Sequence, residues 1–130
     1  MNHNGVISLP TDGASTYTAG MVVSVNNSGQ AKLGTANSNM NGVDAIGVVL
    51  HDVKATETAR PVDIQLFSAG GSALIQSSGT FTKGQLVEVI KNNTTGIVAG
   101  SVGVPTAASK TIGIALEGHT GAGLSRVALV

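Results

Sequence analysis

Cysteine is absent from the sequence, which excludes disulfides, thiolate nucleophiles and metal sites held by cysteine. Aromatic residues make up only 2% of the chain and charged residues 11%, and seven Lys and Arg balance seven Asp and Glu. Nucleic-acid-binding proteins usually carry a basic excess, and many stack bases on aromatic side chains. We therefore expect no nucleic-acid partner.

Long hydrophobic runs are also absent, so the sequence predicts no transmembrane helix and no membrane partner. The first ten residues lack the basic and apolar regions of a signal peptide, and we expect synthesis in a cytoplasm. Hydrophobic residues nevertheless make up 42% of the chain, and eighteen residues are glycine. This composition is typical of short strands joined by tight turns.

Two segments of the chain are repeated in the same order. Thr16–Val25 and Thr80–Val89 share an aromatic residue, two threonines, a glycine and their apolar positions, at an offset of 64 residues. Ala45–Leu50 and Thr111–Leu116 share an Ile-Gly pair followed by apolar residues, at an offset of 66. Because these landmarks keep their order, we interpret them as an internal repeat.

We predict one all-β domain over residues 1–130, a compact barrel or sandwich of short strands. It is built from two tandem related halves, about 5–66 and about 71–130. In each half a short strand precedes the aromatic-Thr-x-Gly turn, and a Val-rich strand, a return strand, the Ile-Gly strand and a closing strand follow it. The apolar runs Met21–Val23 and Val48–Leu50 predict strands that are covered on both faces.

No catalytic constellation is recognisable, so we expect no catalytic residue, cofactor site or metal site, and no enzymatic activity. Serines are frequent, but none lies in the Gly-x-Ser-x-Gly or Ser-x-x-Lys patterns of activated nucleophiles. The glycine-rich segment Gly118–Gly123 lacks the strand–loop–helix context of a phosphate-binding loop. We interpret it as the connection of a hairpin.

Several residues are candidates for contacts with a partner. His51 and His119 lie in equivalent loops and could bind metal or sense pH, although solvated polar residues are favoured because no metal-binding spacing is present. Arg60 and Arg126 each precede a closing strand at an offset of 66. Each could bind a partner carboxylate or simply protect a strand edge from aggregation. The candidate contacts are Ile7, Leu9, Arg60, Arg126, His51 and His119.

Ile7 and Leu9 belong to the segment Met1–Pro10, for which two interpretations stay open. The segment is either a flexible arm that adds a strand to a neighbouring molecule or the first strand of the first repeat.

The Thr-x-Gly turns and Ile-Gly strands resemble the small capsid decoration, or cement, proteins of tailed bacteriophages. The resemblance rests on Thr18–Val25, Ala45–Leu50, Thr82–Val89 and Thr111–Leu116. It implies a virion protein on the outer surface of the capsid, most often a homotrimer, that binds across subunits of the major capsid protein. No individual binding residue can be carried over, because the matched motifs describe the fold.

An alternative function is a head-fibre or tail-associated module that binds host glycans. Proteins usually recognise sugars by stacking them on exposed aromatic side chains, and this chain has only Tyr17, Phe67 and Phe81. Two of these, Tyr17 and Phe81, occupy repeat-equivalent positions that are typical of a core.

Overall fold

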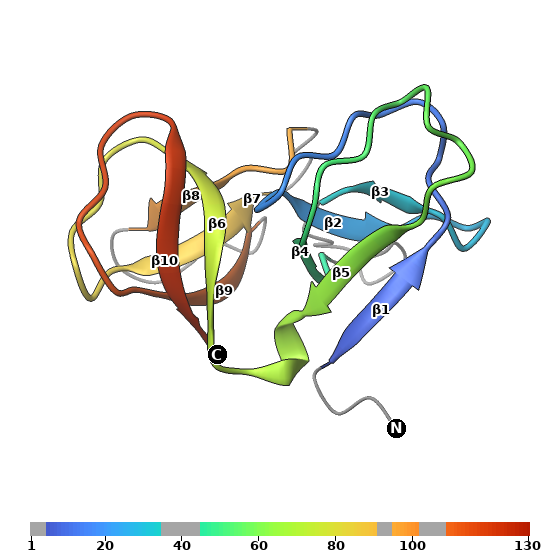
Figure 1. The fold of residues 1–130 in the computed structure, drawn as a ribbon. Helices are drawn as coiled ribbons and strands as arrows, with labels where there is room; N and C mark the ends of the chain where they lie inside the picture. Colours follow the sequence, from blue (N-terminus) through green and yellow to red (C-terminus); the bar gives the residue numbers. More distant parts are fainter. Residues whose placement is uncertain (1–4, 35–44, 91–94, 102–108) are drawn as a thin grey trace.

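The computed structural model describes residues 5–34, 45–90, 95–101 and 109–130. These residues form ten β-strands and one short 3-10 helix, without any α-helix, and the predicted all-β class is confirmed. The strands form two five-stranded units that lie side by side (Figure 1). We call residues 5–66 lobe 1 and residues 72–130 lobe 2. Among the described residues, no helix is long and apolar enough to cross a membrane.

Each lobe contains five strands, and the 3-10 helix η1 (Phe67–Ala69) connects the lobes. Lobe 1 contains β1 (Val6–Leu9), β2 (Val22–Val25), β3 (Ala31–Leu33), β4 (Gly47–Val49) and β5 (Val62–Leu66). Lobe 2 contains β6 (Ser72–Ser78), β7 (Leu86–Ile90), β8 (Val98–Ser101), β9 (Ser109–Ala115) and β10 (Gly123–Leu129).

The two lobes have the same strand order. The sheet of lobe 1 runs β1-β5-β4-β2-β3, and the closed barrel of lobe 2, followed from β6, runs β6-β10-β9-β7-β8. Each strand of lobe 1 thus has its equivalent five strands later in the chain. The prediction of two tandem related halves is confirmed by this topology.

The registers of the strand pairs define which residues are equivalent. Gly47 pairs with Leu66 on one side and Val23 on the other, and Gly113 pairs with Leu129 and Val87 in the same way. The Ile-Gly strands therefore match at the predicted offset of 66. The closing strands, however, match at an offset of 63, because the chain from Gly47 to its partner Leu66 is three residues longer than the chain from Gly113 to its partner Leu129.

This register corrects the predicted equivalence of the two arginines. Residue 126 lies opposite residue 74 on β6, and residue 63 lies opposite residue 8 on β1. Arg126 is therefore equivalent to Asp63, in the middle of its strand. Arg60 lies in a bend before β5 and has no arginine counterpart in lobe 2.

The Thr-x-Gly motif forms the same turn in both lobes. The N–H of Met21 donates to the carbonyl of Thr18 at 3.0 Å, and the N–H of Gln85 donates to that of Thr82 at 3.1 Å. The third residue of each turn is a glycine with a positive φ, 92° at Gly20 and 90° at Gly84. Only glycine adopts this backbone conformation without strain, which explains why the motif is repeated.

The lobes differ in how their first and third strands meet. In lobe 2, two parallel pairs between β6 and β8, Ser77 with Val98 and Ser78 with Ala99, close the barrel. In lobe 1 the equivalent contact is a single parallel bridge between Thr11 and Ala31. Lobe 1 is thus a less completely closed version of the same barrel.

Two apolar clusters form the core. One lies within lobe 1, whereas the other combines Val22, Ala45 and Val48 of lobe 1 with Phe67 and the interior of lobe 2. Backbone hydrogen bonds also join the lobes, for example from the N–H of Val22 to the carbonyl of Gly96 at 2.7 Å. The lobes therefore share one of their two apolar clusters.

The predicted burial of the apolar runs holds for most of their residues. Val22, Val23, Val48 and Val49 are all buried. The prediction is wrong for Leu50, which follows the last residue of β4 and is 43% exposed. Its side chain faces the space between the lobes.

Candidate binding groove

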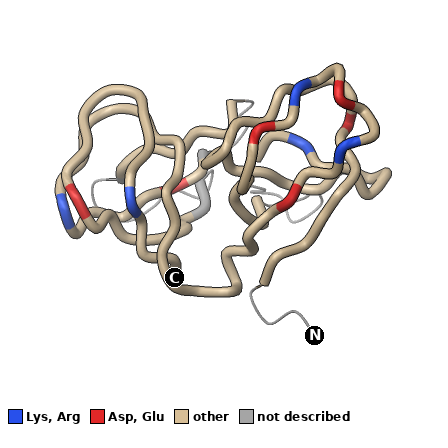
Figure 2. The backbone as a smooth tube through the Cα atoms, viewed as in Figure 1, with Lys and Arg blue, Asp and Glu red and all other residues tan. Residues whose placement is uncertain are grey.

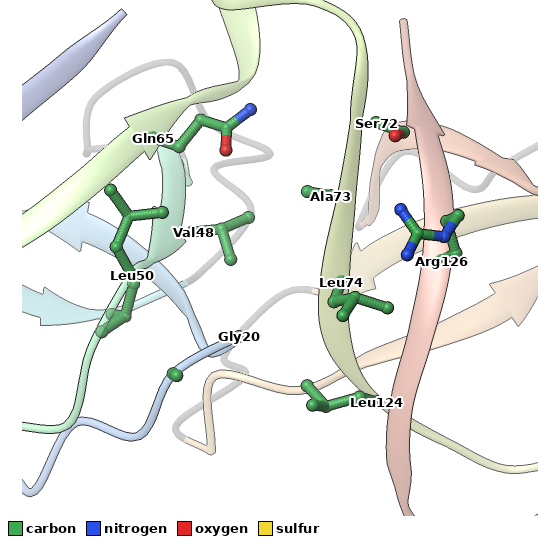
Figure 3. A pocket seen from close by; sticks show the side chains of 11 residues that line it. Gly20, Val48, Leu50, Gln65, Ser72, Ala73, Leu74, Leu124 and Arg126 are labelled. Atoms are coloured by element: carbon green, nitrogen blue, oxygen red, sulfur yellow. The ribbon is translucent and has the colours of Figure 1, made fainter.

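A groove with a volume of about 370 Å³ lies between the two lobes (Figure 3). Lobe 1 lines it with the turn before β2, with β4 and with β5, and lobe 2 lines it with β6 and β10. The volume is within the range of ligand-binding clefts. The lining residues are Ala19, Gly20, Val48, Val49, Leu50, Gln65, Ser72, Ala73, Leu74, Leu124 and Arg126.

Gly20 brings the lobes together beside the groove. Its carbonyl accepts a hydrogen bond of 2.8 Å from the N–H of Gln76 on β6. A Cβ atom at Gly20 would lie 2.5 Å from the Cδ2 of Leu124 and 3.2 Å from the carbonyl oxygen of Leu74. The turn glycine of lobe 1 is therefore also required by its close approach to lobe 2.

Strand alternation places the side chains of lobe 2 in the groove. On β10, Ser125, Val127 and Leu129 are buried inside the barrel, so Leu124 and Arg126 project outward. Leu74 on β6 lies opposite Arg126 and also projects outward. Leu74 is 44% exposed and Leu124 47% exposed, and both line the groove together with Leu50 of lobe 1. Half of the six large apolar side chains that are exposed in the described residues thus line this groove.

Arg126 is the one charged side chain among the described residues that line the groove. Its guanidinium extends from β10 toward β6 and the groove (Figure 3). Within the part of the chain that the structure describes, this guanidinium forms no hydrogen bond or ion pair. Arg126 is bonded through its backbone: its N–H donates to the Glu117 carboxylate at 3.1 Å, and its carbonyl accepts from the N–H of Leu116 at 3.0 Å. Charged residues gather instead on the loops at one end of lobe 1 (Figure 2).

Arg60 lies among those loops and already has a partner. Its guanidinium lies 3.3 Å from the carboxylate of Glu57, three residues earlier, and both side chains are exposed. The backbone N–H of Lys54 and the Arg60 guanidinium both lower the pKa of Glu57. The structure therefore separates the two arginines: Arg60 belongs to a local loop contact, and Arg126 lies in the groove.

His51 belongs to a polar row across three segments of lobe 1. Its Nε2 lies 2.8 Å from one oxygen of Asp63, and the hydroxyl of Ser8 donates to the other oxygen at 2.5 Å. The Ser8 hydrogen bond, together with the one to His51, holds the pKa of Asp63 below its ordinary value. In a Ser-His-Asp triad the serine hydroxyl is bonded to the histidine, whereas here Ser8 and His51 are both bonded to the Asp63 carboxylate.

His119 has a different environment in lobe 2. Its ring stacks on Phe81 with the centroids 5.0 Å apart, and its Nε2 is 2.9 Å from the carbonyl of Gly121. Its backbone pairs with Phe81 as Val53 pairs with Tyr17. The two histidines thus lie in equivalent loops but at non-equivalent positions, and no group of three His, Asp or Glu among the described residues could hold a metal ion.

Ile7 and Leu9 lie on β1, which pairs with β5 along its whole length. Both side chains are partly buried against the apolar cluster of lobe 1. Within the described residues this segment is therefore the first strand of the repeat, and residues 1–4 of the predicted arm lie outside them. Gly118–Gly123 connects β9 with β10, as the hairpin interpretation predicted.

No direct signal for the groove or for the Ser8–Asp63–His51 row is present in the sequence. The alternation of Val62 and Ile64 with Asp63 and Gln65 placed the polar residues on the outer face of their strand. Their neighbours, however, come from segments more than ten residues away. The pairing of β5 with β1 and with β4, and the contact between the lobes, bring these residues together.

No protein-family model and no curated protein matches this chain.

Proposed function

We propose that this protein decorates the outer surface of a tailed-bacteriophage capsid and stabilises the shell by binding across subunits of the major capsid protein. The observation that supports this proposal is the groove shared by the two lobes. Its apolar side chains are exposed, and it carries a single charge. Exposed apolar patches of this kind are typical of surfaces that bind other proteins.

A packing role agrees with the small number of charges on the molecule. A stable protein interface buries about 1,600 Å² in total, and apolar burial contributes roughly 25 cal/mol per Å² before the costs of association. A homotrimer, the oligomer that we propose, would engage several shell subunits at once and raise the effective affinity without new contacts. Neither contribution requires a reactive group.

The glycan-binding alternative receives no support from the aromatic side chains. Tyr17 is completely buried, and Phe81 and Phe67 are only 2% and 8% exposed. None of the three can stack on a sugar at the surface without a rearrangement of the core. We therefore propose a structural role in the virion.

The experiment compares particles that contain the protein with particles from which it has been deleted. We expect the deleted particles to release DNA at a lower temperature and at a lower chelator concentration, and re-addition of the protein to restore both values. DNA release is measured by the fluorescence of an intercalating dye during heating. Equal release from both kinds of particle contradicts the stabilising role, and absence of the protein from purified virions contradicts the proposal as a whole.

A further inference from the structure

We infer that the groove between the lobes binds a segment of the capsid shell in which a large apolar side chain is followed or preceded by a carboxylate. This inference rests on the proposed function, since it names the surface through which the protein contacts the shell. It goes further by assigning the contact to particular residues and by stating the chemistry of the bound segment.

The apolar part of the segment is deduced from the walls of the groove. Leu50 approaches from lobe 1, and Leu74 and Leu124 approach from lobe 2, with Val48 and Ala73 between them (Figure 3). The three leucines are each exposed by 43% to 47%. An apolar side chain placed between them would cover all three at once, as anchor residues do at the centres of interfaces.

The carboxylate is deduced from Arg126. Its guanidinium has no partner within the described residues, and no acidic side chain among them lines the groove. A guanidinium beside apolar surface favours a carboxylate, which it can bind through two parallel hydrogen bonds. A polyanion such as nucleic acid would need several such cations, and the groove offers one.

The comparison of the repeats supports the same assignment independently. The polar row of lobe 1 is satisfied internally, because Ser8 and His51 both bond to Asp63. At the equivalent positions on β6 and β10, lobe 2 has Leu74 and Arg126 instead. These two residues line the groove, so the second copy lacks the internal side-chain contact of the first and exposes apolar surface beside an unpaired guanidinium.

The experiment measures binding of single variants to expanded, DNA-free shells of the major capsid protein that lack this protein. We expect Leu74→Ser and Leu124→Ser to weaken binding about tenfold and Arg126→Glu about a hundredfold. Ile114→Ser is the matched apolar control, because Ile114 is an exposed residue of the same barrel, 36% exposed, outside the groove lining. Arg60→Glu is the matched charge control, and both controls should bind within twofold of the wild type.

A second measurement does not depend on affinity. Because the chain has no cysteine, Ser72→Cys and Ser78→Cys each introduce one thiol, both at exposed positions of β6, the first in the groove and the second outside it. Shells should slow labelling of the groove thiol at least tenfold and leave the control thiol unchanged. Circular dichroism establishes that every variant is folded.

The outcomes separate the inference from the proposed function. If the wild-type protein does not bind shells, both are wrong. If it binds, but the groove variants bind as tightly as the controls and the thiol at residue 72 is labelled as fast as before, the groove inference alone is wrong and the shell contacts another face.

Discussion

The two lobes have one strand order but present different surfaces. Lobe 1 satisfies its outer polar groups internally, through the hydrogen bonds of Asp63 with Ser8 and His51. Lobe 2 has Arg126 at the place of Asp63 and surrounds it with exposed leucines. The two repeats therefore share their interior residues and their turns, whereas the outer positions of the same strands carry different side chains.

The interiors, by contrast, are closely alike. Tyr17 and Phe81 occupy the same place, each pairing its backbone with the loop after the Ile-Gly strand. Gly47 and Gly113 also occupy equivalent positions, and the backbone of the closing strand lies close to each glycine. Substitutions at these places test whether the lobes are equivalent and whether they behave as one unit.

The largest expected effect is that of Phe81→Ala, which removes a buried aromatic side chain from the shared cluster. Such truncations cost about 3–5 kcal/mol, and the cluster includes Val22 and Val48 of lobe 1. The single tyrosine of the chain, Tyr17, lies in lobe 1, so its near-UV circular dichroism reports that lobe. We expect the midpoints of two thermal transitions, one followed by the near-UV signal of Tyr17 and the other by the far-UV signal, to shift together to lower temperature.

An unchanged transition of Tyr17, with a shifted far-UV transition, would mean that the lobes unfold separately. The two lobes would then be two independent domains.

A smaller effect is expected for Gly47→Ala and Gly113→Ala. The added Cβ would lie 2.3 Å from the Gln65 carbonyl oxygen in lobe 1 and 2.2 Å from the Ala128 carbonyl oxygen in lobe 2. Because both neighbours are backbone atoms, the closing strand must move, at a cost of about 1–3 kcal/mol. Urea unfolding should give similar losses for the two variants.

Gly118→Ala is the control, since its Cβ would meet only the Phe81 carbonyl oxygen at 3.9 Å; it should change stability by less than about 0.5 kcal/mol. A large loss at one of the two equivalent glycines and none at the other would show that the lobes pack differently.

The smallest effect concerns pH. The pKa of Asp63 is lowered in the folded protein, first by the Ser8 hydroxyl and then by His51. Its contribution to stability is therefore present above the unfolded pKa of about 3.9 and is lost as the pH falls through the lower folded value. Because the side chain is 36% exposed, the contribution is at most about 1 kcal/mol.

Asp63→Asn should flatten the acid limb of unfolding free energy against pH, and Ser8→Ala should raise the pKa of Asp63 in an NMR titration. Arg126→Gln, at the equivalent position of lobe 2, should leave the acid limb unchanged. An acid limb that is the same in wild type and in Asp63→Asn would refute this account of the polar row.

Much of the fold could be predicted from the sequence because its signals are local. The Thr-x-Gly turn requires a glycine of positive φ, and the Ile-Gly strand requires a glycine where two backbones approach, so both motifs recur visibly. The match of Arg60 with Arg126 failed because the chain between the paired residues of the Ile-Gly strand and the closing strand is three residues longer in lobe 1. One shared residue type is too weak a signal to set a register.

The groove could not be predicted for a different physical reason. Its walls come from both repeats, and the exposure of Leu50 depends on where lobe 2 lies against β4. Alternation along a strand tells which side chains point outward, but not which outer face another lobe will cover. Leu50 and Val48 illustrate this, since one is exposed and the other is buried.

The strand order also has a consequence for synthesis on the ribosome. Every strand pair of lobe 1 lies within residues 6–66, so the nascent chain can complete that sheet before all strands of lobe 2 have emerged from the ribosome. Val22, Ala45 and Val48 are then still uncovered, because their packing partners belong to the second half. The first repeat thereby offers a preformed apolar template on which the second repeat folds.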